Sequence, residues 1–169
     1  MSVSLFDVTV PVMIHGLKNL SNLLDKAAAH AAAKKIDPVA YTHARLFPDM
    51  LPMTRQVQIA CDTAKGAAAR LAGIEIPKFE DNESTFAELQ ARIAKTVDFL
   101  NTVKAAQFQG AETREIVMKL PSTTLNFTGL SFVNLYALPN FYFHITMTYA
   151  LLRKGGLEIG KRDYLGPIQ

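Results

Sequence analysis

The stretch LSFVNLYALPNFYFHITMTYALLR, residues 130–153, decides the fold. It carries no formal charge before Arg153, and a helix this apolar belongs at the buried centre of a domain. Asn140, His144 and Thr148 recur every four residues within it, so they form one polar stripe along the helix. Because large apolar side chains surround this stripe, we expect a functional site to lie there.

The wider segment from Leu120 to Leu152 contains no Lys, Arg, Asp or Glu and is long enough to cross a bilayer. Polar residues and prolines interrupt it throughout, however, and buried polar groups are costly in lipid. We therefore expect a core helix of a water-soluble protein, with no membrane partner. The interrupting residues are Pro121, Ser122, Thr123, Thr124, Asn126, Asn134, Pro139, Asn140 and His144.

The composition indicates an ordinary globular domain. The chain has 169 residues, 49% of them hydrophobic, which fits a single domain (1–169) with a well-filled core. Its net charge of +3 comes from scattered basic residues without interleaved aromatics, so nothing favours a nucleic-acid partner. The single Cys61 excludes an internal disulfide, and the first residues, which include Asp7, lack the features of a secretory signal. We expect a cytoplasmic location.

Four long segments show apolar residues at a helical period. The second begins at Pro52 and is closed by Gly73, and the third begins at a capping box formed by Thr85 and Glu88. Pro11, near the start of the first segment, marks either its first turn or a kink. The predicted long helices cover about 3–33, 52–71, 85–100 and 130–153.

Shorter elements connect these helices. A short helix is predicted over 37–45, after the first long helix. Apolar and polar residues alternate over 115–120, and after a turn the run 124–127 pairs back as a β-hairpin. The tail 157–169 is expected to be an extended surface segment. These elements predict an all-α fold, a four-helix bundle with a small hairpin between the third and fourth helices.

Five segments carry a family resemblance: SLFDVTVPV (4–12), DMLPMTRQVQIACDTAKGAAARLAG (49–73), PKFEDNESTFAELQARI (77–93), LPNFYFHITMTYALLR (138–153) and GKRDYLG (160–166). They resemble a bacterial family of domains of unknown function within the DinB/YfiT-like superfamily, four-helix bundles described as metalloenzymes. The resemblance covers nearly the whole chain, and its most specific part is PNFYFH. It implies a bundle fold and a homodimer.

Relatives in this superfamily bind a metal ion through three histidines, one on the second helix and a His-x-x-x-His pair on the fourth. The resemblance places that pair at Asn140 and His144, so its first member is an asparagine in this chain. The predicted second helix contains no histidine, and the nearest is His43. A Zn or Ni ion would therefore need His144 and Asn140 together with His43 or Asp62.

Three polar residues of the second helix, Arg55, Gln58 and Asp62, lie near one face because residues at i, i+3 and i+7 align. If this face is turned toward His144, Asp62 sets the tautomer of the imidazole and Arg55 binds an anionic ligand. The alternative is a solvated edge on which Arg55, Asp62 and Lys65 pair locally.

Three functions are compatible with these residues. The first is an enzyme or binding protein with a small-molecule pocket in the bundle core, where His144 acts as ligand or general base and Asn140 orients the bound molecule. The second is a non-catalytic dimeric helical module with a degraded metal site, in which His144 is a hydrogen-bonded core residue that fixes packing. The third, implied by the resemblance, is a metal-dependent enzyme similar to thiol transferases.

Overall fold

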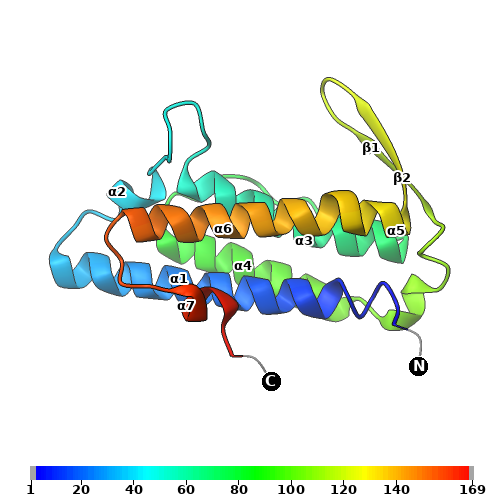
Figure 1. Ribbon diagram of the computed structural model, residues 1–169, viewed down its shortest axis with the longest axis horizontal. Coiled ribbons are helices and arrows are strands. Elements are labelled where there is room, and N and C mark those ends of the chain that lie inside the picture. Colours follow the sequence, from blue (N-terminus) through cyan, green and yellow to red (C-terminus); the bar gives the residue numbers. More distant parts are fainter. Residues whose placement is uncertain (1–2, 168–169) are drawn as a thin grey trace.

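Four long helices lie side by side along the long axis of the molecule in the computed structural model, which describes residues 3–167 (Figure 1). They are α1 (Val10–Lys34), α3 (Met53–Ala72), α4 (Phe86–Thr102) and α6 (Leu138–Lys154). α3 packs against α6 and α4, and α1 packs against α4 and α6. The helices therefore surround one core, as the predicted bundle requires.

The core is filled by large side chains from all four helices. Leu20 of α1, Leu71 of α3, Leu89 of α4 and Phe141 of α6 are fully buried. Cys61 is buried among them, and burial raises the pKa of its thiol to about 12. The thiol is thus protonated and unreactive at neutral pH.

Local signals set the ends of the long helices. The Glu88 backbone amide donates to Thr85 Oγ1 at 3.2 Å, and the Thr85 amide donates to the Glu88 carboxylate at 2.9 Å, which confirms the capping box. Hydrogen bonds from Ser84 and Thr85 lower the pKa of Glu88 to about 2. α3 ends at Gly73, whose φ of 69° lies in the region that favours glycine.

The first helix is shorter than predicted, since it begins at Val10 and not at Val3. Ahead of it Ser4 and Asp7 close a turn, in which the Asp7 carboxylate accepts from the Ser4 amide at 3.0 Å and from its hydroxyl at 2.8 Å. Pro11 lies in the first helical turn, where its missing N–H costs no hydrogen bond. Pro11 therefore marks the helix start and not a kink.

The short helix predicted over 37–45 is a single turn, α2 (Val39–Thr42). The Val39 amide donates to the Asp37 carboxylate at 2.9 Å, so Asp37 satisfies a free amide at the start of this turn. A loop over 43–52 then projects from the bundle beside the start of α3 (Figure 1).

The predicted fourth helix, 130–153, consists of two α-helical parts joined by a π-helical turn. α5 (Gly129–Phe132) leads into the π turn (Val133–Ala137), and α6 follows directly. Pro139 lies in the first turn of α6 and removes one donor from the hydrogen-bond ladder where the wider π turn precedes it. No helix within residues 3–167, this one included, is long and apolar enough to cross a membrane.

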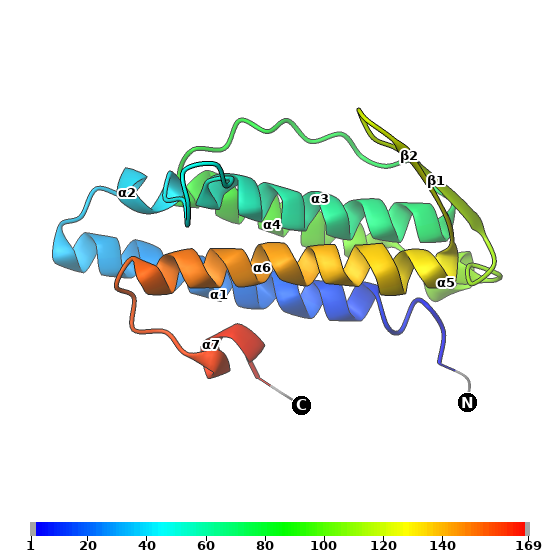
Figure 2. The same cartoon turned by 45° about the horizontal axis from the view of Figure 1, so that its top comes forward.

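The predicted hairpin is formed by β1 (Glu115–Lys119) and β2 (Thr124–Thr128), which pair antiparallel. A short 3₁₀ helix, η1 (Ala105–Phe108), precedes it. Ile116 and Met118 are buried while their neighbours in β1 are exposed, as the alternation in the sequence predicts. The hairpin projects away from the bundle at the end where α5 begins (Figures 1 and 2).

The C-terminal tail is not extended, contrary to the prediction, because it forms α7 (Lys161–Leu165) and packs on α1. Asp163 makes an ion pair with Lys26 of α1. The Asn19 amide, also on α1, donates to the Leu165 carbonyl at 2.8 Å. These contacts join segments far apart in the chain, so no local pattern reveals them. Residues 168 and 169 of the predicted tail lie outside the described residues.

Candidate functional site

α6 turns the predicted polar stripe toward α3, but only two of its three members reach the edge of the helix pair. His144 is 7% exposed and Asn140 is half-buried, whereas Thr148 is fully buried. The Thr148 hydroxyl donates to the His144 carbonyl oxygen of its own helix at 3.1 Å. Thr148 is therefore not placed to contact a ligand, and the candidate site narrows to Asn140 and His144.

His144 is held by Gln56 of α3. The two side chains meet at 2.7 Å, between His144 Nδ1 and Gln56 Oε1. Gln56 Nε2 donates to the Leu51 carbonyl at 3.0 Å, so Gln56 Oε1 acts as the acceptor and Nδ1 of His144 carries the proton. Burial lowers the pKa of His144 below its usual value of 6.5. The ring is thus neutral at pH 7, with an unprotonated Nε2.

The Nε2 atom of His144 reaches solvent. Within residues 3–167 the Nε of Arg92 is the one side-chain nitrogen or oxygen that is buried without a hydrogen-bond partner. His144 Nε2 has no partner among these residues either, so it cannot be buried. Phe143, which is 52% exposed, packs edge-on to the imidazole with ring centroids 5.1 Å apart. The result is an apolar wall beside an open acceptor nitrogen.

Asn140 lies one helical turn from His144 on the same side of α6. Its Nδ2 donates to Thr63 Oγ1 of α3 at 2.8 Å. The Oδ1 atom makes no hydrogen bond within residues 3–167 and, by the same reasoning as for His144 Nε2, is reached by solvent. The surface where α3 meets α6 therefore presents two hydrogen-bond acceptors one turn apart.

Gln56 and Thr63, the α3 residues that bind His144 and Asn140, are not among the site residues predicted from the sequence. They are seven residues apart, so they share one face of α3. Because α3 and α6 run antiparallel (Figure 1), Gln56 meets His144 and Thr63 meets Asn140. The spacing was visible in the sequence, but the rotation that brings the two faces together was not.

The other predicted residues, Arg55, Gln58 and Asp62, face α4 and the connecting segment 74–85. Asp62 Oδ1 lies 2.7 Å from Nη2 of Arg92, a residue of α4. Arg55 Nη1 donates to Gln58 Oε1 at 2.7 Å, on its own helix. The structure thus separates these three residues from His144.

This placement corrects the predicted role of Asp62, which does not set the tautomer of His144, because Gln56 does. The alternative of a solvated edge holds in part, since Asp62 pairs with Lys65 at 2.7 Å. Gln58, however, is 1% exposed, so the face is covered. Arg55 pairs with Asp81 at 2.6 Å and is not placed to bind an anion beside His144.

Arg92 anchors the connecting segment 74–85 to the bundle. Its guanidinium lies 3.0 Å from Glu83 Oε1, and its side chain is 1% exposed. The Lys95 ammonium lies 4.2 Å from the centre of the Phe79 ring in the same segment. Figure 2 shows the segment running along α3. Because the charges of this cluster are paired with one another, its role is structural.

Comparison with known proteins agrees with this architecture. Residues 5–165 match the family model "Domain of unknown function (DUF1993)". The chain belongs to this family. A crystal structure of a DinB family member protein from Shewanella denitrificans is similar, with a TM-score of 0.89 and 44% sequence identity over 97% of this chain and 93% of that chain. No curated protein matched. The DinB-like fold implied by the resemblance is confirmed.

This DUF1993 domain does not present the ligands that a metal centre in the bundle needs. No three His, Cys, Asp or Glu side chains within residues 3–167 gather closely enough to hold a cation. His144 Nδ1 is bound to Gln56, and Asp62 is paired with Arg92. His43 is exposed at the end of α2. The residues present therefore do not fit the Zn or Ni site that the family resemblance would imply.

Proposed function

We propose that the surface around Asn140 and His144, where α3 meets α6, binds a small organic molecule, which donates a hydrogen bond to Nε2 of His144. The observation that carries the proposal is the state of this ring. Its Nδ1–H is held by Gln56 at 2.7 Å, while its Nε2 has no protein partner within residues 3–167 and meets solvent. A buried ring that exposes one acceptor atom is suited to select a donor group on a ligand.

The side chains around His144 restrict which functional groups the ligand can carry. Neutral His144 accepts a hydrogen bond from a hydroxyl, thiol or amine, and accepts the proton itself where the donor is acidic enough. Asn140 Oδ1 offers a second acceptor about 5–6 Å along the helix. Phe143 adds an exposed aromatic wall. We therefore expect a molecule with two donor groups and an apolar portion, such as an amino alcohol or a polyol with a hydrocarbon substituent.

The metal-dependent, thiol-transferase-like function loses its support in this chain. Its chemistry requires three protein ligands around the ion. The site at His144 offers an amide from Gln56 and an amide from Asn140 in place of further histidines. We propose a ligand site in which Gln56 positions the imidazole directly.

The test is a fragment screen followed by protein-detected NMR on the wild-type domain. We expect amino alcohols or polyols to shift the ring resonances of His144 and the amides of α3 and α6 around it. His144→Ala should weaken such binding about tenfold or more, since it removes the acceptor. His43→Ala, which alters an exposed histidine at the end of α2, away from this site, is the matched control. Equal binding by wild type and His144→Ala would refute the proposal, as would the absence of any binder.

A non-catalytic homodimer is the second candidate, favoured by the apolar surface of the fourth helix. Leu135 is 72% exposed, Phe143 52% and Tyr142 38%. Large apolar side chains gathered on one surface are typical of interaction sites. Light scattering should then give a dimer in solution, and Leu135→Glu with Phe143→Glu should give a folded monomer. A wild-type protein that is monomeric at high micromolar concentration would exclude this candidate.

A further inference from the structure

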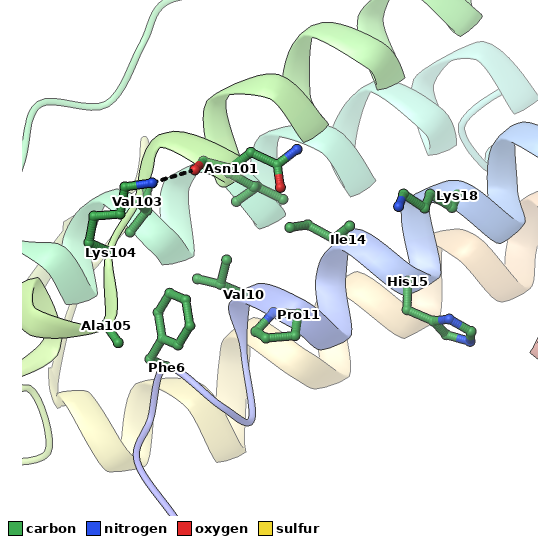
Figure 3. Close-up of a pocket in the computed structure, with 11 residues that line it drawn as sticks. Phe6, Val10, Pro11, Ile14, His15, Lys18, Asn101, Val103, Lys104 and Ala105 are labelled. Carbon is green, nitrogen blue, oxygen red and sulfur yellow. Dashed lines mark hydrogen bonds between the residues drawn. The ribbon is translucent and has the colours of Figure 1, made fainter. Parts of the chain in front are cut away.

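A hollow lies between the first turns of α1 and the end of α4 (Figure 3). Its volume of ≈ 520 Å³ lies in the range of small-molecule sites. It shares no residue with the candidate site at His144. The hollow is lined by Phe6, Val10, Pro11, Ile14, His15, Lys18, Leu100, Asn101, Val103, Lys104 and Ala105.

The floor of this hollow is apolar and rigid. Val10 and Leu100 belong to the core, with 2% and 0% exposure. Phe6 and Ile14 are half-buried and form the walls. The Phe6 ring is held in place by an edge-on contact with Phe108, with centroids 5.3 Å apart. Because Val10 and Leu100 are already covered, the apolar surface that a hydrocarbon group could cover without rearranging the core is that of Phe6 and Ile14.

The charged residues of the hollow are cationic. Lys18 and Lys104 line it, and no Asp or Glu does. Figure 3 shows the Lys18 ammonium turned toward Ile14, whereas the His15 ring points away from the hollow. His15 Nε2 is bound to the Leu165 carbonyl at 2.8 Å, outside the hollow. Lys104 Nζ donates to the Asn101 carbonyl at 3.3 Å, a long bond that a carboxylate can replace.

We infer that this hollow binds an amphiphilic organic anion, a medium-chain carboxylate. The hydrocarbon chain lies on the half-buried side chains of Phe6 and Ile14, and the carboxylate pairs with Lys18 or Lys104. The first contact follows from the apolar surface that these two side chains leave accessible, and the second from two lysines among lining residues that include no Asp or Glu. The inference is independent of the proposed function, because the two sites use different helices and residues.

The experiment is a titration of the full chain with sodium octanoate, followed by backbone-amide NMR. We expect saturable shifts confined to residues 6–18 and 100–105. The double variant Lys18→Gln with Lys104→Gln should weaken octanoate about fivefold or more, because it removes both cations with which the carboxylate can pair. Lys119→Gln, an exposed lysine on the hairpin, is the control for a general loss of positive charge and should leave affinity unchanged.

1-Octanol, which has the same chain without the charge, separates the two halves of the inference. It should bind the same residues more weakly than octanoate, and it should not distinguish the double variant from wild type. Octanoate shifts elsewhere on the domain, or none at all, would overturn the inference. Equal weakening by Lys119→Gln would do so too, because binding would then follow net charge and not this hollow.

Discussion

His144 of α6 and Gln56 of α3 lie 2.7 Å apart, and Gln56 in turn lies 3.0 Å from the Leu51 carbonyl. One amide side chain thus links the fourth helix of the bundle, the start of the second and the loop before it. The same link orients the imidazole, because it leaves Nε2 as the acceptor that faces solvent. This one contact therefore both joins two helices of the bundle and orients the imidazole of the candidate site.

Gln56→Leu should destabilise the domain by about 1–3 kcal/mol. It leaves the buried His144 Nδ1–H without its acceptor and the Leu51 carbonyl without its donor. The ring should also lose its fixed tautomer, which the ¹⁵N chemical shifts of the two ring nitrogens report. Urea unfolding measures the stability change. Gln109→Leu, an exposed position, is the control and should be close to neutral. An unchanged tautomer in Gln56→Leu would contradict the role given to Gln56.

Stability should fall as the pH is lowered through the range in which an ordinary histidine titrates. Burial lowers the pKa of His144 below 6.5, so the unfolded chain takes up this proton before the native protein does. The free energy of unfolding contributed by the neutral ring is therefore complete above about pH 6.5 and is lost progressively as the pH drops toward the native pKa.

The comparison of wild type with His144→Gln isolates this dependence from the other histidines. Urea unfolding between about pH 7.5 and about pH 5.5 should show a steeper decline for wild type than for the variant. Parallel curves would mean that the native environment does not disfavour the charged form of His144.

Arg92→Met should destabilise the domain by about 1–3 kcal/mol, because it removes the buried cation that joins carboxylates from three parts of the chain. Asp62 and Asp81 lie 2.7 and 2.9 Å from Arg92 Nη2. Hydrogen exchange should rise in the segment 74–85, which Arg92 anchors. Arg162→Met, an exposed arginine on α7, should change neither quantity. Unchanged exchange over 74–85 in Arg92→Met would show that the segment is held by its other contacts.

Gly166→Ala should release the C-terminal helix from α1. Gly166 has a φ of 67°, and a Cβ at this position would collide with the Asn19 side chain. Gly110→Ala is a matched control, since Gly110 has a φ of 68° but nothing within 4 Å of the added carbon. The control should cost only the backbone strain of about 1 kcal/mol. Hydrogen exchange over 160–166 should rise in Gly166→Ala alone, and equal behaviour of both variants would remove the collision as the cause.

Much of the fold could be read from local patterns. The period of apolar residues predicted the second helix at 52–71, and α3 covers Met53–Ala72. The capping box at Thr85 and the glycine at 73 act within one helical turn, so their effect does not depend on the rest of the chain. The same holds for the alternation that predicted β1. The start of the first helix was misplaced because the turn closed by Ser4 and Asp7 interrupts an otherwise helical pattern.

The sequence predicted the residues that α6 contributes to the candidate site, but not those that α3 contributes. The four-residue spacing of Asn140 and His144 is a property of α6 alone, and it predicted that both share one face of that helix. The structure shows that this face meets α3. Which residues of α3 meet them depends on how that helix is rotated about its own axis. The sequence analysis favoured the most polar face of α3, which carries Arg55, Gln58 and Asp62. In the structure this face contacts α4, where Asp62 pairs with the buried Arg92.

The sequence by itself determined the bundle and the polar stripe, because helix periods and caps are set by neighbours within a few residues. Only the tertiary structure decided that Gln56 holds His144, that Thr148 is buried and that α7 packs on α1. Each of these depends on packing between segments that are distant in the chain. A rotation of one helix by a single residue, about 100°, exchanges the side chains that face its neighbour.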